Sequence, residues 1–358
     1  MSDFNCLAAR LGAMRSRLLT RRAYEELIVL PDFPAILAAL LNGPYGPAIE
    51  AAGEAEADPV KIEEGLRRDF SATLTKLLRM SGDEPRVWVE MLLAYWDLYN
   101  LKTILRGKQI LLPPEEIVRS LIPTATYDEP ALRELAKQPS LRAVVDLLLT
   151  WRSPHAAPLT EALRDYHEAR DLYLLELALD RFYFRQPGRI DADGWILESE
   201  RSTHQKSLRA FLGHLADKTN LMTALKMADE RAVFLERGRF FLPGGTSFPY
   251  GDFVKVLEAG GLAEALLRVR ATRFGPVLAG LGEPPPGLGT LAWVEKQLER
   301  ATLRTAHRIH RTDPLGVGVV MAFLWDKIHE LMNLRMIVRG RLVNLPEPTL
   351  LGLLTMEV

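Results

Sequence analysis

Cysteine is nearly absent from this sequence of 358 residues, in which Cys6 is the only one. A single thiol excludes an intramolecular disulfide framework and is typical of a reducing compartment. No histidine and no basic helix start lies beside Cys6 to activate a thiolate. We therefore interpret Cys6 as a small buried apolar residue rather than as a nucleophile.

Net charge is almost absent as well, at −1, although charged residues make up 25% of the chain. A protein that binds nucleic acid electrostatically needs a clearly basic surface, so that class is excluded for the molecule as a whole. Hydrophobic residues make up 48%, which is enough for a sizeable core. At about 100–200 residues per domain, the length predicts two or three domains.

Long hydrophobic runs are also missing. The longest, PLGVGVVMAFLW at 314–325, is far shorter than the roughly 20 residues that cross a bilayer. Near the N-terminus, Arg10, Arg15 and Arg17 interrupt any apolar stretch of the kind that a signal peptide needs. We therefore expect a soluble protein with no membrane span, which another protein would hold if it works at a membrane.

The motifs of common enzyme sites are lacking. The stretch DPLGVGVV at 313–320 lacks the third glycine and the Gly-Lys-Ser/Thr of phosphate-binding loops, and no Gly-x-Ser-x-Gly elbow occurs. A zinc-binding helix that starts at His329 would need a second histidine where Asn333 stands. His307 and His310 have basic neighbours that would repel a cation, so we expect them on a solvated helix face. The sequence predicts no catalytic, cofactor-binding or metal-binding residues.

Helical periodicity is what the sequence does contain. Apolar residues recur at steps of three and four along residues 83–107, 167–184 and 291–309. Clusters of proline and glycine separate such segments and mark loops. Alternating patterns typical of strands are rare, so we predict an all-α fold.

One phrase occurs three times. It reads acid, two residues, Asn-Leu, three residues, a large aliphatic residue and a base, at 97–106, 217–226 and 330–339. A second pattern, Glu-x-x-Leu-x-Arg, precedes each copy and starts at Glu63, Glu176 and Glu295. Two patterns that recur in the same order predict a triplicated module. Cutting at the prolines gives three similar helical domains, 1–112, 113–242 and 243–358.

The composition of the repeated phrase predicts its structure. The Leu and the aliphatic residue four positions later share a helix face and should be buried together. The asparagine amide can satisfy loose backbone groups of an adjacent loop or helix end. The closing base suits the negative end of the helix dipole, and we expect Gly107 and Gly340 to supply the left-handed residue that ends the helix. In the second copy Met227 follows the base, so the helix should run on.

A basic stripe is the best candidate for a contact surface. Arg300, Arg304, Arg308 and Arg311 follow steps of three or four residues and form one helical stripe. The stripe lacks the interleaved aromatics that stack on bases, which disfavours a nucleic-acid surface. Contact with an acidic partner protein fits the pattern as well, but a merely solvated helix face, balanced by acids elsewhere, is the commonest outcome for such a pattern.

The end of the sequence resembles a known family. DPLGVGVVMAFLWDKIHELMNLRMIVRGRLVNLP, at 313–346, is similar to the signature region of the C subunit of bacterial V/A-type rotary ATPases, the counterpart of the vacuolar d subunit. LAARLGAMRSRLLTRRAYEEL at 7–27 resembles the opening helix of that family, and Tyr45-Gly46 fits too. The middle match, DKTNLMTALK at 217–226, is shorter, and Gly12 stands in a segment that is often basic in relatives.

The resemblance implies a fold and a function. It implies three similar helical domains in a funnel with pseudo-threefold symmetry, which sits on the membrane rotor ring (c/L/K subunits) at the cytoplasmic face of the membrane. The funnel receives the central shaft, made of the D and F subunits, touches the a/I stator subunit of the membrane transiently, and transmits torque between shaft and ring. Such a subunit is not an enzyme and needs no cofactor.

Two other classes stay open at this point. An all-α scaffold or repeat adaptor unrelated to rotary ATPases would also be built from a repeated helical module. An enzyme whose site is assembled from residues far apart in the sequence would leave no local motif. The similarity at 313–346 favours the rotary subunit.

Overall fold

Every regular element in the described part of the chain is a helix. The computed structural model describes residues 3–53, 59–169, 171–192, 203–229, 237–279, 281–285 and 287–356. Within these ranges there is no strand, and long helices alternate with groups of short ones. The all-α prediction is confirmed.

Contacts divide the chain into two compact units, residues 1–89 with 269–358 and residues 90–268. Each unit therefore has a core of its own. The three-domain division into 1–112, 113–242 and 243–358 stays a prediction.

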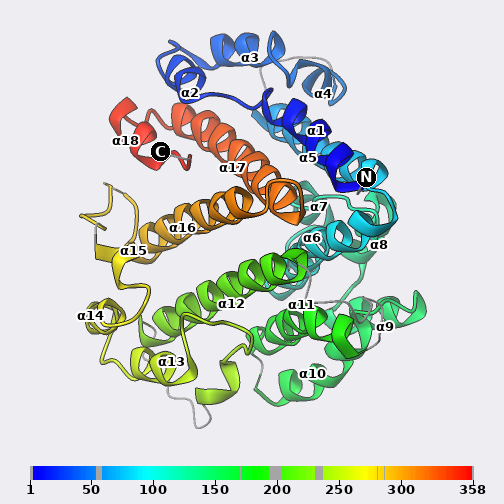
Figure 1. Cartoon of the computed structure of the whole chain (residues 1–358), viewed down its shortest axis with the longest axis vertical. Helices are drawn as coiled ribbons and strands as arrows, with labels where there is room; N and C mark the ends of the chain where they lie inside the picture. Colours follow the sequence, from blue (N-terminus) through cyan, green and yellow to red (C-terminus); the bar gives the residue numbers. More distant parts are fainter. Residues whose placement is uncertain are drawn as a thin grey trace. The chain divides into compact units, whose positions relative to one another are not determined.

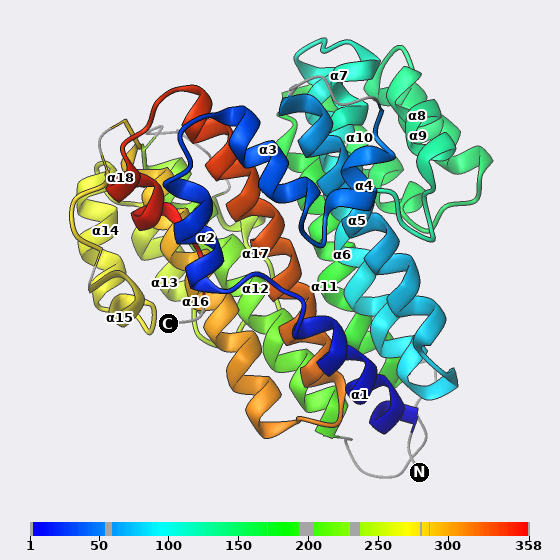
Figure 2. The same ribbon diagram turned by 90° about the horizontal axis from the view of Figure 1, so that it is seen from above.

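The first unit is built around one long buried helix. Its elements are α1 (Asp3–Arg15), α2 (Arg21–Ile28), α3 (Phe33–Leu41), α4 (Gly46–Glu50), α5 (Pro59–Met80), the beginning of α6 (Asp83–Gln109), the end of α14 (Leu262–Arg270), α15 (Gly275–Ala279), α16 (Thr290–Thr312), α17 (Val317–Leu342) and α18 (Glu347–Leu353). Helix α17 packs along α16 and also contacts α1, α2, α3, α5 and α18 (Figures 1 and 2). Residues 317–325 are all buried, which explains the apolar run as the start of a core helix.

The second unit contains the rest of α6 and α14 with the elements between them. These are α7 (Pro114–Arg119), α8 (Glu129–Lys137), α9 (Leu141–Thr150), α10 (Ala156–Ala169), α11 (Tyr173–Ala192), α12 (Thr203–Asp229), the 3-10 helix η1 (Arg237–Phe240) and α13 (Tyr250–Leu257). Helix α12 ends at Asp229, three residues beyond Lys226, so it runs on past the base as predicted.

Several short helices start where a side chain caps them. Thr20, Asp32, Asp128 and Ser140 each accept a hydrogen bond from the backbone N–H three residues later, at the starts of α2, α3, α8 and α9. Such a cap stabilises a helix by about 1 kcal/mol. Capping thus explains why these segments are helical although they are too short to be stable alone.

The helix-ending role predicted for Gly107 and Gly340 is wrong. Both glycines lie inside their helices, and the left-handed residues are Leu111 (φ 58°) and Asn344 (φ 54°). The N–H of the next residue then bonds back to the glycine carbonyl, at 2.9 Å for Leu112 and 2.8 Å for Leu345. The two helices therefore end in the same motif, but four residues later than predicted.

Close packing explains these two glycines instead. A Cβ on Gly107 would lie 2.5 Å from the side chain of Ile117 in α7, and one on Gly340 would lie 2.4 Å from that of Leu350 in α18. In both copies the short helix after the turn folds back onto the glycine, ten residues further along the chain. The glycine is needed for this approach and not for its backbone conformation.

The prediction that Cys6 is buried is also wrong, because its side chain is exposed. The buried face of α1 is formed by Phe4, Leu7 and Leu11, which follow helical steps of three and four. Cys6 lies off that stripe. In the described ranges, no helix combines the length and hydropathy that a membrane span requires.

We predict that Gly107→Ala and Gly340→Ala each lower the free energy of unfolding by about 1–3 kcal/mol, because a packed side chain must move. The control is Gly12→Ala in α1, where an added Cβ meets no atom within 4 Å. That change should raise stability by about 0.5–1 kcal/mol. Urea unfolding of the three variants measures this, and a gain in stability in all three would contradict the packing argument.

Candidate interaction site

The asparagine of the repeated phrase makes the same contact in all three copies. Its amide nitrogen donates to, and its amide oxygen accepts from, the backbone of the residue 22 positions later. We call each of these an asparagine clasp. The pairs are Asn100 with Ile122, Asn220 with Leu242 and Asn333 with Thr355, at 2.6–2.9 Å.

The clasps are buried, since each asparagine is at most 1% exposed. One primary amide pairs with the N–H and the C=O of a single residue, so these two backbone groups are satisfied without water. The prediction that this asparagine satisfies loose backbone groups is confirmed. The loop that it holds was not identifiable from local spacing, because the partner lies 22 residues away.

In the first two copies, the acid one turn before the asparagine binds the loop just beyond the residue that the asparagine holds. Thr124 donates to Asp97 at 2.5 Å, and the N–H groups of Thr246, Ser247 and Phe248 donate to Asp217 at 2.7–3.1 Å. Burial raises the pKa of Asp97 to about 6, and its hydroxyl partners only partly oppose this effect.

In the third copy the acid binds a segment from the other end of the chain. Glu330 in α17 accepts hydrogen bonds from the N–H of Leu19, at 2.5 Å, and from the hydroxyl of Tyr45. Lys327 lies 2.8 Å from Asp69, donates to the Tyr45 hydroxyl at 2.9 Å and stacks on the Tyr45 ring. Burial raises the pKa of Glu330, while Lys327 and the hydrogen bonds oppose the rise. This cluster joins α17 to residues near both α1 and α5.

The two repeated sequence patterns also meet in space. Arg106, the closing base of the first phrase, binds Glu176 through two hydrogen bonds of 2.6 Å within the second unit. Arg339, the closing base of the third phrase, binds Glu63 at 2.5 and 2.6 Å within the first unit. Both acids open a Glu-x-x-Leu-x-Arg pattern. Paired, two-pronged contacts of this kind fix the relative orientation of helices more than they add energy.

The four arginines of the predicted basic stripe do not share one role. Arg300 donates to the carbonyls of Gly352, at 2.6 Å, and Leu354, at 2.8 Å, and lies over the ring of Trp293. Burial, together with Arg304, lowers the pKa of Arg300. Arg300 therefore ties α16 to the end of α18.

The other members of the stripe, Arg304, Arg308 and Arg311, are exposed on α16. Their side chains are placed where a partner could reach them. Whether they bind one stays a prediction.

The expectation that His307 lies on a solvated face is wrong, because the residue is 3% exposed. Its Nε2 lies 2.7 Å from Asp326, and Arg15 Nη2 lies 3.0 Å from its Nδ1. Since a guanidinium only donates, Nδ1 accepts and Nε2–H donates. Arg15 also pairs with Asp326 at 2.9 Å, so this histidine belongs to the contact between α1, α16 and α17.

These clusters are occupied by internal hydrogen bonds and ion pairs. Among the described residues, no three histidine, cysteine, aspartate or glutamate side chains gather closely enough to hold a metal ion. The clusters described above join helices and loops.

Comparison with known proteins decides the family. The model of the ATP synthase (C/AC39) subunit family matches residues 7–351. The chain belongs to this family.

Individual relatives extend over nearly the whole chain. The C subunit of the V-type ATP synthase of Thermus thermophilus is 28% identical over 344 residues, 96% of this chain and 96% of that protein. The C subunit of the A-type ATP synthase of Methanocaldococcus jannaschii is 26% identical, over 99% of this chain and 86% of that protein. The C subunit of the V-type enzyme of Deinococcus radiodurans is 26% identical, over 96% of this chain and 89% of that protein.

The resemblance inferred from the sequence is thus confirmed, and the chain is a non-catalytic subunit of an A/V-type ATP synthase. An adaptor unrelated to rotary ATPases is not supported.

Some important residues of this C/AC39 subunit give little signal in the sequence. Tyr45 stands out there only through the family resemblance, yet it is 2% exposed and binds Glu330. Lys327 and Asp69 belong to the same cluster and to no repeated pattern. The only hint of this cluster in the sequence is that the third phrase begins with glutamate, whereas the other two begin with aspartate.

We predict that Asn220→Ala opens the second clasp and lowers the free energy of unfolding by about 2–4 kcal/mol, because it leaves a buried N–H and a buried C=O unsatisfied. The amide of Leu242 should exchange with deuterium faster than in the unchanged protein. The control Asn42→Ala removes an amide that bonds to the carbonyl of Ala38 near the surface, and should cost less than about 1 kcal/mol. Unchanged exchange at Leu242 would contradict the role given to the clasp.

The raised pKa of Asp97 makes stability depend on pH. The folded protein holds a proton on Asp97 up to about pH 6, whereas an ordinary aspartate loses it near 3.8. Between these values the folded state binds more protons, so stability falls as pH rises, by about 3 kcal/mol in total. Asp97→Asn should remove the share of that slope that comes from Asp97 and keep the bond from Thr124. Urea unfolding from pH 4 to 7 tests this, with exposed Asp146→Asn as the control; a slope in Asp97→Asn as steep as that of the unchanged protein would contradict the assignment.

Proposed function

We propose that this chain couples the central shaft to the membrane rotor ring of a rotary ATP synthase and transmits torque between them. Its partners would be the D and F subunits of the shaft on one side and the ring of c/L/K subunits on the other, with a transient contact to the a/I stator subunit. It would lie on the cytoplasmic face of the membrane, held there by the ring. Membership of the C/AC39 family is the observation that carries this proposal.

The internal bonding supports a mechanical role. A part that passes torque must resist deformation, and α6, α12 and α17 are each fastened by a buried clasp near the middle or the end of the helix. Two-pronged ion pairs add a second connection at the ends of α6 and α17. Neither kind of contact requires a reaction, a cofactor or a bound nucleotide.

The recurrence of the clasp also supports the proposed arrangement of the chain. The same side chain meets the backbone at the same separation of 22 residues three times. We propose that three similar modules, 1–112, 113–242 and 243–358, surround a hollow with pseudo-threefold symmetry, as the family resemblance implies. The hollow would receive the end of the shaft.

The exposed part of the basic stripe is the proposed contact with an acidic partner surface. We predict that Arg304→Glu with Arg308→Glu weakens capture of either the shaft subunits or the ring about tenfold, a loss of about 1.4 kcal/mol. Rim charges of this kind act most strongly at low salt, so the effect should shrink as salt is raised. Pull-down of each partner with the purified full chain measures it.

A matched variant separates position from charge. Arg119→Glu with Arg164→Glu makes the same change at two exposed arginines on α7 and α10 and should leave capture unaltered. Equal binding of the Arg304/Arg308 variant and the unchanged chain to both partners would remove the stripe from the proposal. Failure of the unchanged chain to bind either partner would overturn the coupling function itself.

A further inference from the structure

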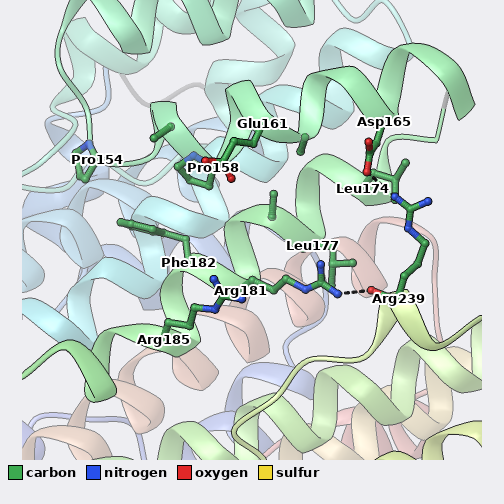
Figure 3. A pocket seen from close by; sticks show the side chains of 13 residues that line it. Pro154, Pro158, Glu161, Asp165, Leu174, Leu177, Arg181, Phe182, Arg185 and Arg239 are labelled. Carbon is green, nitrogen blue, oxygen red and sulfur yellow. Dashed lines mark hydrogen bonds and ion pairs between the residues drawn. The ribbon is translucent and has the colours of Figure 1, made fainter. Parts of the chain in front are cut away.

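An open cavity of about 790 Å³ lies between α10 and α11 in the second unit (Figure 3). One wall consists of α10 and the turn before it, the other of α11, and Arg239 of η1 closes one side. No asparagine clasp or repeated ion pair lines this cavity. We call it the α10–α11 groove.

The floor of the groove is apolar, and charged side chains line its edges. Small side chains on both helices leave room between them, and larger aliphatic and aromatic side chains form the rest of the apolar lining. The apolar lining residues are Ala157, Pro158, Ala162, Leu174, Leu177, Ala178 and Phe182. From Leu174 to Arg185 the groove follows α11 for about 16 Å, or three helical turns. Low ridges of this kind let another helix approach closely.

The rim of the groove carries three arginines, Arg181, Arg185 and Arg239, against two acids, Glu161 and Asp165, so positive charge is in excess. Arg239 pairs with Asp165 at 2.5 Å, and Arg181 donates to the backbone carbonyl of Arg239 rather than to an acid. Burial lowers the pKa of Arg181, and the neighbouring charges of Arg185 and Arg239 lower it further. Arg185 is exposed and makes no ion pair with another described residue.

We propose that the α10–α11 groove binds an amphipathic helix of a partner protein. Small and aliphatic side chains of that helix lie between α10 and α11, and acidic side chains one turn apart on its flank face Arg181 and Arg185. The proposal goes beyond the coupling function and does not depend on which subunits the chain joins.

Charge and shape together favour a helix over a small anion. Arg181 and Arg185 are four residues apart, so they lie one turn apart on α11, the spacing that two carboxylates one turn apart on an adjacent helix would match. A small anion would neutralise the arginines but would leave the apolar length of the groove in contact with water. Burying that length is the main source of binding energy that the surface offers.

Binding of designed peptides to the purified full chain tests the proposal. The probe is a fluorescent helical peptide of about 15 residues, with Leu and Ala on one face and Glu one turn apart on its edge. The matched peptide has Lys in place of Glu. Fluorescence anisotropy should show at least tenfold tighter binding of the Glu peptide.

Two variants locate the site. Arg181→Glu with Arg185→Glu should reverse the preference between the two peptides, and Ala178→Trp, which fills the groove but keeps both arginines, should abolish binding of either. Arg164→Glu, an exposed arginine of α10 outside the groove, should change nothing. Circular dichroism verifies that each variant is folded.

Several results would overturn the proposal. These are equal binding of the two peptides, a preference that survives reversal of both arginines, and no binding of either peptide at millimolar concentration. Binding of inorganic phosphate that depends on Arg181 and Arg185, without binding of the Glu peptide, would show a small-anion site instead. None of these results bears on capture of the shaft or the ring, so the coupling proposal would stand or fall separately.

Discussion

The asparagine clasp is the contact on which the rest of the fold depends. A long helix offers no spare backbone groups in its middle, so a loop that crosses it there must find side chains that replace water. Asn100, Asn220 and Asn333 each present one donor and one acceptor to the backbone C=O and N–H of the residue 22 positions later. This separation sets the length of chain that leaves each long helix and folds back onto it, and it thereby constrains the position of the short helical segment in between.

The third clasp shows how the two ends of the chain are joined. In the first two copies the acid of the phrase binds the loop that follows in sequence, whereas Glu330 binds Leu19 and Tyr45 near the N-terminus. Leu19 directly precedes the capped start of α2, and Thr124, which binds Asp97, lies four residues before the capping Asp128 of α8. The N-terminal segment thus occupies the place that a continuing chain would have filled, and residues 3–53 and 287–356 fold as parts of one unit.

Periodicity and repetition predicted the all-α class and the clasp asparagine, because each depends on short-range spacing within one helix, whereas the family was inferred from the resemblance of residues 313–346 and 7–27. Contacts between distant segments were not predictable in this way. Gly107 and Gly340 carry no sign in the sequence that they lie under Ile117 and Leu350 rather than at a helix end. His307 looked solvated among arginines because Arg15 and Asp326, its partners, are far away in sequence. The arginine stripe could be predicted from its periodicity, but the hydrogen bond from Arg300 to a backbone carbonyl of α18 could not.

The clasps and ion pairs bear on the proposed mechanical role because helix ends and connecting loops are where a helical protein opens first. A load that separates a loop from its helix has to break two buried hydrogen bonds at each clasp together, since one amide makes both. At the ends of α6 and α17 the same load meets an arginine whose two nitrogens hold one carboxylate, a geometry that resists rotation better than a single contact. Stiffness is therefore concentrated where a helical body is otherwise weakest, while exposed charges such as Arg304 and Arg308 remain for contacts that form and break.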